Sequence, residues 1–277
     1  MWDVRKLVVA AIIFTAVYDK LKAAAKDVTL LQTPPDRIHG LYIGCPEEAM
    51  EKIILSGLLE QELNQSVEFQ KNWSEKPKCS KLIPGGKKEH TAALSTYNTG
   101  LDFMKTFNNE MQRMAGNFSN YEENFHFKSL HFLLLDSMRL LKPKKCKSVY
   151  ILQDENRLRE GTTVRFEHFT TASSNFHPRD TDMADMVLLN ITSCFFVDLN
   201  DQLCLNNMEN NILLSPAEVF TVERIKDTQY NDDEYTEVTL KHSELDISHS
   251  CHVLSRSPTV VSTLWVVSGL VVLSLFL

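Results

Sequence analysis

The 277-residue sequence lacks several patterns that identify common classes of protein. It has no excess of positive charge, since 29 Lys and Arg stand against 36 Asp and Glu. The net charge of -7 argues against nucleic acid as a partner, because phosphate binding needs clustered basic residues. No Cys-x-x-Cys pair is present, so no metal site is predicted. No Gly-x-Gly-x-x-Gly motif follows a predicted strand, which removes the Rossmann interpretation.

The N-terminus has the pattern of a secretory signal peptide over residues 1–25. Arg5 and Lys6 precede an apolar run from Leu7 to Tyr18, and three alanines follow at 23–25. The apolar run is shorter than the roughly 20 residues that span a bilayer core. A buried N-terminal helix is the alternative interpretation.

The C-terminus is apolar from Val260 to Leu277, just after the small residues Ser255 and Ser257. Such a tail is typical of a signal for attachment of a glycosylphosphatidylinositol (GPI) anchor, and it is removed from the mature protein. The alternative is a retained membrane helix, which usually has basic residues on its cytoplasmic side. We therefore predict one domain over 26–255 and a GPI-attachment propeptide over 256–277. The predicted location is the extracellular face of the plasma membrane, with a secreted protein as the alternative.

Cysteines and glycosylation motifs fit that location. Six cysteines lie between the two processed segments, and an even number in a secreted chain indicates disulfides. They are Cys45, Cys79, Cys146, Cys194, Cys204 and Cys251. Asn-x-Ser/Thr motifs predict glycans at Asn64, Asn72, Asn117 and Asn190.

The order of apolar patterns predicts an α+β fold. Leu101–Met114 has apolar residues at three- and four-residue steps, and residues 121–142 are apolar nearly all round, so both are predicted core helices. His126 and His131 are five residues apart, which does not suit a shared metal, and we interpret both as packed or capped. Runs rich in β-formers predict strands at 147–152, 163–171, 186–194, 211–214, 219–225 and 235–242. Helices followed by strands favour α+β over a parallel βαβ fold.

Four segments, in order, resemble motifs of the vertebrate arginine-specific ecto-ADP-ribosyltransferases. Residues 125–135 are close to Phe-x-Phe-Lys-x-x-His-Phe-x-Leu-Thr, and 146–152 are similar to Cys-x-x-Val-Tyr-Arg-Gly. Residues 164–173 resemble Val-Arg-Phe-Gly-x-Phe-x-Ser-x-Ser, and 209–220 resemble Glu-x-Glu-Val-Leu-Ile-Pro-x-x-Glu-Val-Phe. The resemblance covers roughly residues 36–251.

The resemblance implies a fold, a reaction and a disulfide pattern. An N-terminal helical part would pack on a C-terminal antiparallel β-sandwich-like core with a central NAD cleft. Family members transfer ADP-ribose from NAD or NADP to protein arginine and release nicotinamide, without a metal. The implied disulfides are Cys45–Cys251 and Cys146–Cys194, which leaves Cys79 and Cys204 for a third.

The family's catalytic positions, carried over by this resemblance, are poorly preserved. The arginine that grips NAD falls on Ile151, and the NAD-site serines fall on Thr171 and Ser173. The catalytic glutamate falls on Asn211, whereas Glu209 stays at the position that steers the acceptor arginine. An oxocarbenium-like transition state needs a nearby carboxylate, and losing one such group costs about 2.7–4 kcal/mol.

The sequence therefore predicts a family member with weak or no transferase activity. The alternative function is a non-catalytic recognition protein on the same fold, with an unknown cell-surface protein as its partner. Two alternative assignments would preserve transferase activity. A one-residue shift would give Glu209 the catalytic role, although the match at 212–216 fixes the register. Alternatively, Arg157, Arg159 or Arg165 would replace the missing arginine.

Overall fold

The computed structural model describes residues 30–32, 38, 42, 44–75, 80–114, 118–154, 158–176, 186–205, 211–230 and 233–246. The predicted signal peptide and C-terminal propeptide lie outside these residues, as do Cys79, Asn117, Glu209 and Cys251. Within the described ranges, no helix combines the length and the apolar character needed to cross a bilayer.

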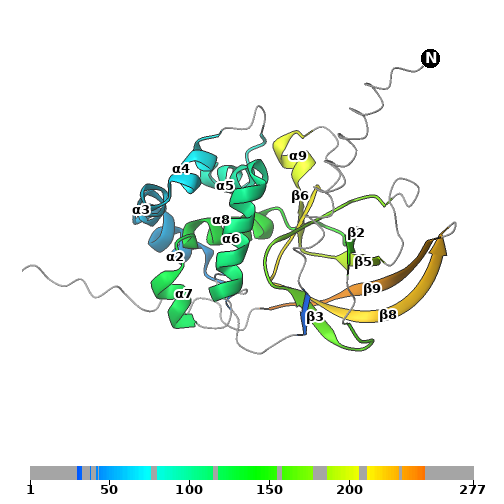
Figure 1. Cartoon of the computed structure of the whole chain (residues 1–277). Coiled ribbons are helices and arrows are strands. Elements are labelled where there is room, and N and C mark those ends of the chain that lie inside the picture. Colours follow the sequence, from blue (N-terminus) through cyan, green and yellow to red (C-terminus); the bar gives the residue numbers. More distant parts are fainter. Residues whose placement is uncertain are drawn as a thin grey trace, which may run out of the picture.

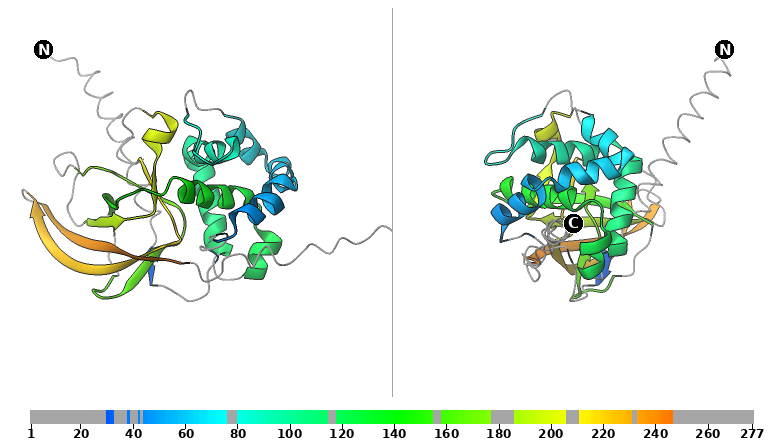
Figure 2. Two further views of the ribbon diagram at one scale, coloured as in Figure 1. Left: turned by 180° about the vertical axis from the view of Figure 1, so that it is seen from behind. Right: turned by 90° about the vertical axis from the view of Figure 1, so that its left-hand side faces the viewer.

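The first half of the described chain is helical, as predicted. Its helical segments are α2 (Pro46–Ala49), the π-helical η2 (Met50–Leu55), α3 (Leu58–Gln65), α4 (Val67–Ser74), α5 (Lys88–Thr99), α6 (Leu101–Met114), α7 (Phe118–Asn124) and α8 (Lys128–Leu140). Figure 1 shows these helices gathered on one side of the molecule, with the strands on the other. The view from behind in Figure 2 has the same two parts side by side.

The single helix predicted over 121–142 is wrong, because the chain forms α7 and α8 with a break at 125–127. Phe125 and Phe127 both pack against the ring of Phe107, with centroids 6.1 and 5.9 Å away. Side chains two residues apart in a helix point to different faces. Leaving the helix at this point allows both aromatic rings to enter the same core.

The strands form two sheets. Six strands lie in the order β1-β3-β8-β9-β5-β2, and three lie in the order β4-β7-β6. All pairs are antiparallel except β5 with β9, which is parallel. Their bounds are β1 (Leu30–Gln32), β2 (Lys147–Gln153), β3 (Thr163–Phe166), β4 (Thr170–Ala172), β5 (Val187–Ser193), β6 (Phe196–Asp198), β7 (Ile212–Leu214), β8 (Glu218–Tyr230) and β9 (Asp233–Leu245), with helix α9 (Leu199–Leu203) after β6.

Strands β3, β4, β8 and β9 differ from the predicted pattern. The strand predicted over 163–171 is divided into β3 and β4, which belong to different sheets. Strands β8 and β9 are longer than predicted and form a curved two-stranded arm (Figure 1). Their register shifts at Val219/Phe220 and Val222/Arg224, and such bulges increase local bending and twist.

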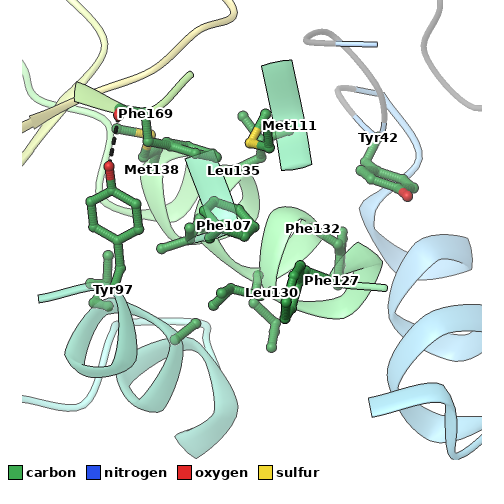
Figure 3. Close-up of a cluster of buried hydrophobic side chains, with 14 of the residues drawn as sticks. Tyr42, Tyr97, Phe107, Met111, Phe127, Leu130, Phe132, Leu135, Met138 and Phe169 are labelled. Carbon is green, nitrogen blue, oxygen red and sulfur yellow. Dashed lines mark hydrogen bonds between the residues drawn. The ribbon is translucent and has the colours of Figure 1, made fainter. Parts of the chain in front are cut away.

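The apolar residues form two cores. One surrounds α8, and Figure 3 shows part of it, with Phe107, Leu130, Phe132 and Met138 close together. The Tyr97 hydroxyl donates to the backbone oxygen of Phe169 at 2.7 Å, which ties helix α5 to the segment just before β4 (Figure 3). The second core is built from strand residues and includes Val149, Ile151, Ala172 and Ile212. These strands position the candidate site.

Helix α8 begins on a buried carboxylate. Glu62 of α3 is 2% exposed, and it accepts hydrogen bonds from the backbone N–H groups of Lys128 at 2.9 Å and Ser129 at 3.0 Å. The Ser129 hydroxyl also donates to it. Burial raises the pKa of Glu62 to about 7, although these donors oppose the rise. A partner 66 residues away thus satisfies the first N–H groups of α8.

Replacing Glu62 by alanine is expected to lower the free energy of unfolding by about 1–3 kcal/mol, because the N–H groups of Lys128 and Ser129 lose their acceptor. Glu62→Gln is the matched control, since its amide oxygen still accepts, and its loss should be smaller. Urea unfolding of both variants measures the difference. Equal losses in the two variants would show that the hydrogen bonds to α8 are not the cause.

Candidate functional site

The structure brings the positions that the resemblance assigns to the site to one junction of strands β2, β4 and β7. Thr171 lies in β4, Ser173 follows it, and Asn211 immediately precedes β7, which pairs with β4. Tyr150 and Ser173 exchange two backbone hydrogen bonds of 2.9 Å, and Ile151 is the next residue of β2. Positions predicted from separate motifs therefore meet in space, while Glu209 lies outside the described residues.

Asn211 is held by its own protein on both sides of its amide. Asn211 is buried, with 4% of its surface exposed. Its Oδ1 accepts from the backbone N–H of Ser174 at 3.3 Å, and its Nδ2 donates to Oδ1 of Asp198 at 3.1 Å. The amide orientation is unambiguous, because a backbone N–H only donates and a carboxylate only accepts. Position 211 thus carries a neutral group whose oxygen and nitrogen each form one hydrogen bond within the protein.

Asp198 brings a negative charge into this junction. It is the last residue of β6 and caps α9, where its Oδ1 accepts from the Asp201 N–H at 3.4 Å. Its Oδ2 lies 3.3 Å from Nζ of Lys147, at the start of β2. Sequence reasoning missed Asp198 and Lys147, which lie 13 and 64 positions from Asn211. Asp198 lies outside the quoted motifs, and Lys147 occupies an unspecified x position of one of them.

Ile151 is 7% exposed and belongs to the strand core together with Val149, Ala172 and Ile212. Its side chain offers no charge and no hydrogen bond. Thr171 and Ser173 are half-buried, and the Ser173 hydroxyl donates to the backbone oxygen of Asn175. The positions that the resemblance assigns to the site therefore present hydroxyls, one hydrogen-bonded amide and an aliphatic side chain, and the charges nearby are the paired Asp198 and Lys147.

The three arginines proposed as replacements have different positions. Arg165 of β3 forms a buried ion pair with Asp246, and the two side chains are 6% and 9% exposed. Arg159 is exposed in the segment before β3, and Arg157 lies outside the described residues. Because Arg165 already has a buried counter-ion, moving it to a substrate phosphate would break this ion pair.

A second buried carboxylate, Glu218, joins three strands. It is fully buried and accepts from the Ser193 hydroxyl at 2.5 Å, the Cys194 N–H at 2.7 Å and Nδ1 of His242 at 2.8 Å. Burial raises its pKa. The potential ligand atoms of Cys194, Glu218 and His242 lie within 4.8 Å of one another. The sulfur of Cys194 is, however, in a disulfide, so this cluster is interpreted as structural.

That disulfide joins Cys146, just before β2, to Cys194, just after β5. It is the pair that the family resemblance implies. Cys45 and Cys204 are also disulfide-bonded, and their implied partners, Cys251 and Cys79, lie outside the described residues.

The predicted glycosylation sites and histidines differ in exposure. Asn64 is exposed, whereas Asn72 is 9% exposed and its Nδ2 donates to the backbone oxygen of Glu68 at 2.8 Å. Asn190 is half-buried in β5, and its Nδ2 donates to Glu237 at 3.0 Å. Exposure therefore favours Asn64 among these three. His131 is packed in the core as predicted, but His126 is exposed.

The helical part packed against two sheets defines an ADP-ribosyltransferase fold. The chain is similar to a solved structure of a mutant of the eukaryotic mono-ADP-ribosyltransferase ART2.2 in complex with NAD, with a TM-score of 0.56 and 23% identity. The match covers 79% of this chain and 96% of that chain.

The sequence comparisons identify the family. The family model for NAD:arginine ADP-ribosyltransferases matches residues 36–247, and the chain belongs to this family. It is 28% identical over 221 residues to Ecto-ADP-ribosyltransferase 5 of Homo sapiens, covering 73% of this chain and 74% of that protein. It is 33% identical over 123 residues to Ecto-ADP-ribosyltransferase 5 of Bos taurus, covering 42% of this chain and 38% of that protein. The match thus spans well under two thirds of the bovine relative's length.

Proposed function

We propose that this chain is a cell-surface member of the family whose transferase activity is weak or absent. The observation that carries this proposal is the state of Asn211, a neutral amide bonded on one side to Asp198 and on the other to the Ser174 backbone. Ile151, at the position that the resemblance assigns to the NAD-binding arginine, adds a second missing charge.

The family reaction explains why these two positions matter. The bond between the ribose and nicotinamide breaks, and nicotinamide leaves with the electron pair. A guanidinium nitrogen of the acceptor then bonds to the ribose carbon and loses a proton. The ribose carries positive charge in the transition state, as in glycoside transfer. An amide already engaged by the protein supplies no counter-charge to it, and one lost electrostatic group lowers the rate by roughly 100–1000-fold.

Surface location is proposed from the two ends of the chain. The N-terminal pattern supports entry to the secretory pathway and the C-terminal pattern supports a GPI anchor. The names of the bovine and human relatives describe those proteins as ecto-enzymes. A silent member at the cell surface would act by binding, with a surface protein as its partner. The second candidate is an active transferase with a reshaped site, which would use Glu209 and NAD.

Labelling of an arginine acceptor separates the two candidates. The full chain, expressed in mammalian cells beside an active family member, is incubated with labelled NAD and agmatine. We expect incorporation at least about 100-fold below that of the active enzyme, because the counter-charge at position 211 is missing. Robust turnover that disappears in a Glu209→Gln variant would refute the proposal and establish the reshaped active site.

A further inference from the structure

We propose that Asp198 is a positioning residue that holds a neutral amide at position 211 and makes this position incompatible with a carboxylate. The inference deepens the proposed function, because it explains why the family's glutamate is absent from this site. Only its consequence for catalysis rests on the proposed function. The hydrogen-bond pair itself can be tested without any activity.

The two neighbours of position 211 require opposite hydrogen-bonding groups. The Ser174 N–H needs an acceptor, and the Asp198 carboxylate needs a donor. An amide supplies both from one planar group. An ionised carboxyl would satisfy Ser174, but its other oxygen would face Asp198 with no proton between them. A protonated carboxyl could replace the amide, at the expense of its charge.

Asp198 is not free to withdraw from such a contact. It is paired with Ile212 in the β6–β7 ladder, and the next N–H, of Leu199, donates to the backbone oxygen of Asn211 at 2.7 Å. The backbone around Asp198 is therefore hydrogen-bonded to the backbone around Asn211, which fixes the distance between the two residues. Lys147, 3.3 Å away, and the Asp201 N–H hold the carboxylate in place.

The same contacts prevent Asp198 from replacing the catalytic glutamate. Its charge is balanced by Lys147 and its Oδ1 is shared between Asn211 and the start of α9. A carboxylate in place of the Asn211 amide would lie within hydrogen-bond reach of Asp198. Like charges at this separation raise the pKa of one member of the pair. Because Lys147 and the Asp201 N–H stabilise the charge of Asp198, the new acid is the member that stays neutral.

An isosteric double-mutant cycle tests the proposal in the full chain purified from mammalian cells. Asn211→Asp keeps the shape and places a carboxyl opposite Asp198, whereas Asn211→Asp with Asp198→Asn exchanges the donor and the acceptor. We expect the single Asn211→Asp change to lower the melting temperature at pH 7.5 by about 5 °C or more. The double variant should recover at least half of this loss. Asn109→Asp, an exposed change in α6, is the control for added charge.

The pH dependence of the cycle separates this mechanism from a general packing defect. Acidification protonates the new carboxyl and returns a donor to Asp198, so the deficit of Asn211→Asp relative to wild type should shrink towards pH 4. A deficit that is constant with pH, or losses that simply add in the double variant, would overturn the proposal. Agmatine labelling by the wild-type chain would instead refute the proposed function and leave the result of the cycle intact.

Discussion

Below pH 6.5, the wild-type chain is expected to lose stability relative to a His131→Asn variant by about 1.4 kcal/mol per pH unit. His131 is fully buried in α8, and burial lowers its pKa to about 3. Histidine in the unfolded chain binds its proton near pH 6.5. Between these two values the unfolded state takes up a proton that the folded state does not, so acid favours unfolding. The full difference reaches about 5 kcal/mol near pH 3.

The surroundings of His131 explain why its neutral form is required. Its Nδ1 bonds to the Tyr121 hydroxyl at 2.7 Å, and Tyr121 in turn bonds to the Tyr42 hydroxyl at 3.1 Å. Its Nε2 has no hydrogen-bond partner among the described residues. The rings of Phe125 and Phe169 lie 6.2 and 6.0 Å from the imidazole. A second proton on this ring would place a charge among aromatic side chains.

Charged groups near this cluster also respond to pH, so the comparison must be made between variants. The negative charges of Glu62 and Glu122 both favour a higher pKa for Tyr42 and for Lys128. The pKa of Glu62 is about 7, above its unfolded value of 4.5, so it stabilises the fold as pH decreases through this window. This opposes His131 in the wild-type curve, but it cancels in the difference between wild type and His131→Asn.

Urea unfolding at a series of pH values from 7 to 4 measures this difference. His126→Asn is the matched control for removal of an imidazole, because His126 is exposed just before the same helix. Parallel curves for wild type and His131→Asn would contradict the prediction. They would mean that the imidazole is protonated in the folded state.

Replacing Cys146 and Cys194 together by serine is expected to lower the free energy of unfolding by about 4 kcal/mol. The disulfide closes a loop of 48 residues, and opening it returns conformational freedom to the unfolded chain. For a domain of this size the melting temperature should fall by roughly 8–16 °C. Scanning calorimetry of the double variant at pH 7.5 measures the shift.

Reduction of the wild-type protein is the control for this prediction. It also opens the disulfides of Cys45 and Cys204, so the loss after reduction should be at least as large as in the double variant. A double variant that melts within about 2 °C of the wild type would show that residual structure already restricts the unfolded chain.

Local sequence patterns predict much of the fold. The three- and four-residue steps of Leu101–Met114 predict α6, because side-chain burial in a helix follows its 3.6-residue period. Runs rich in β-forming residues predict most of the strands. Motif resemblance also named Ile151, Thr171, Ser173 and Asn211, four positions that the sheets bring to one junction. Periodicity and motifs describe neighbours along the chain, so the sequence by itself determined the elements, their order and the candidate positions.

Tertiary structure alone decided what those positions touch. The break before α8 follows from two phenylalanines that share one core, and the division of β3 from β4 follows from pairing in two sheets. The contacts of Glu62 with Ser129 and of Asp198 with Asn211 have no local signature, because each joins separate elements of the fold. Hydrogen bonds between such segments exist only after folding places a donor beside an acceptor. The physical reason that position 211 accommodates an amide therefore became visible only in the folded chain.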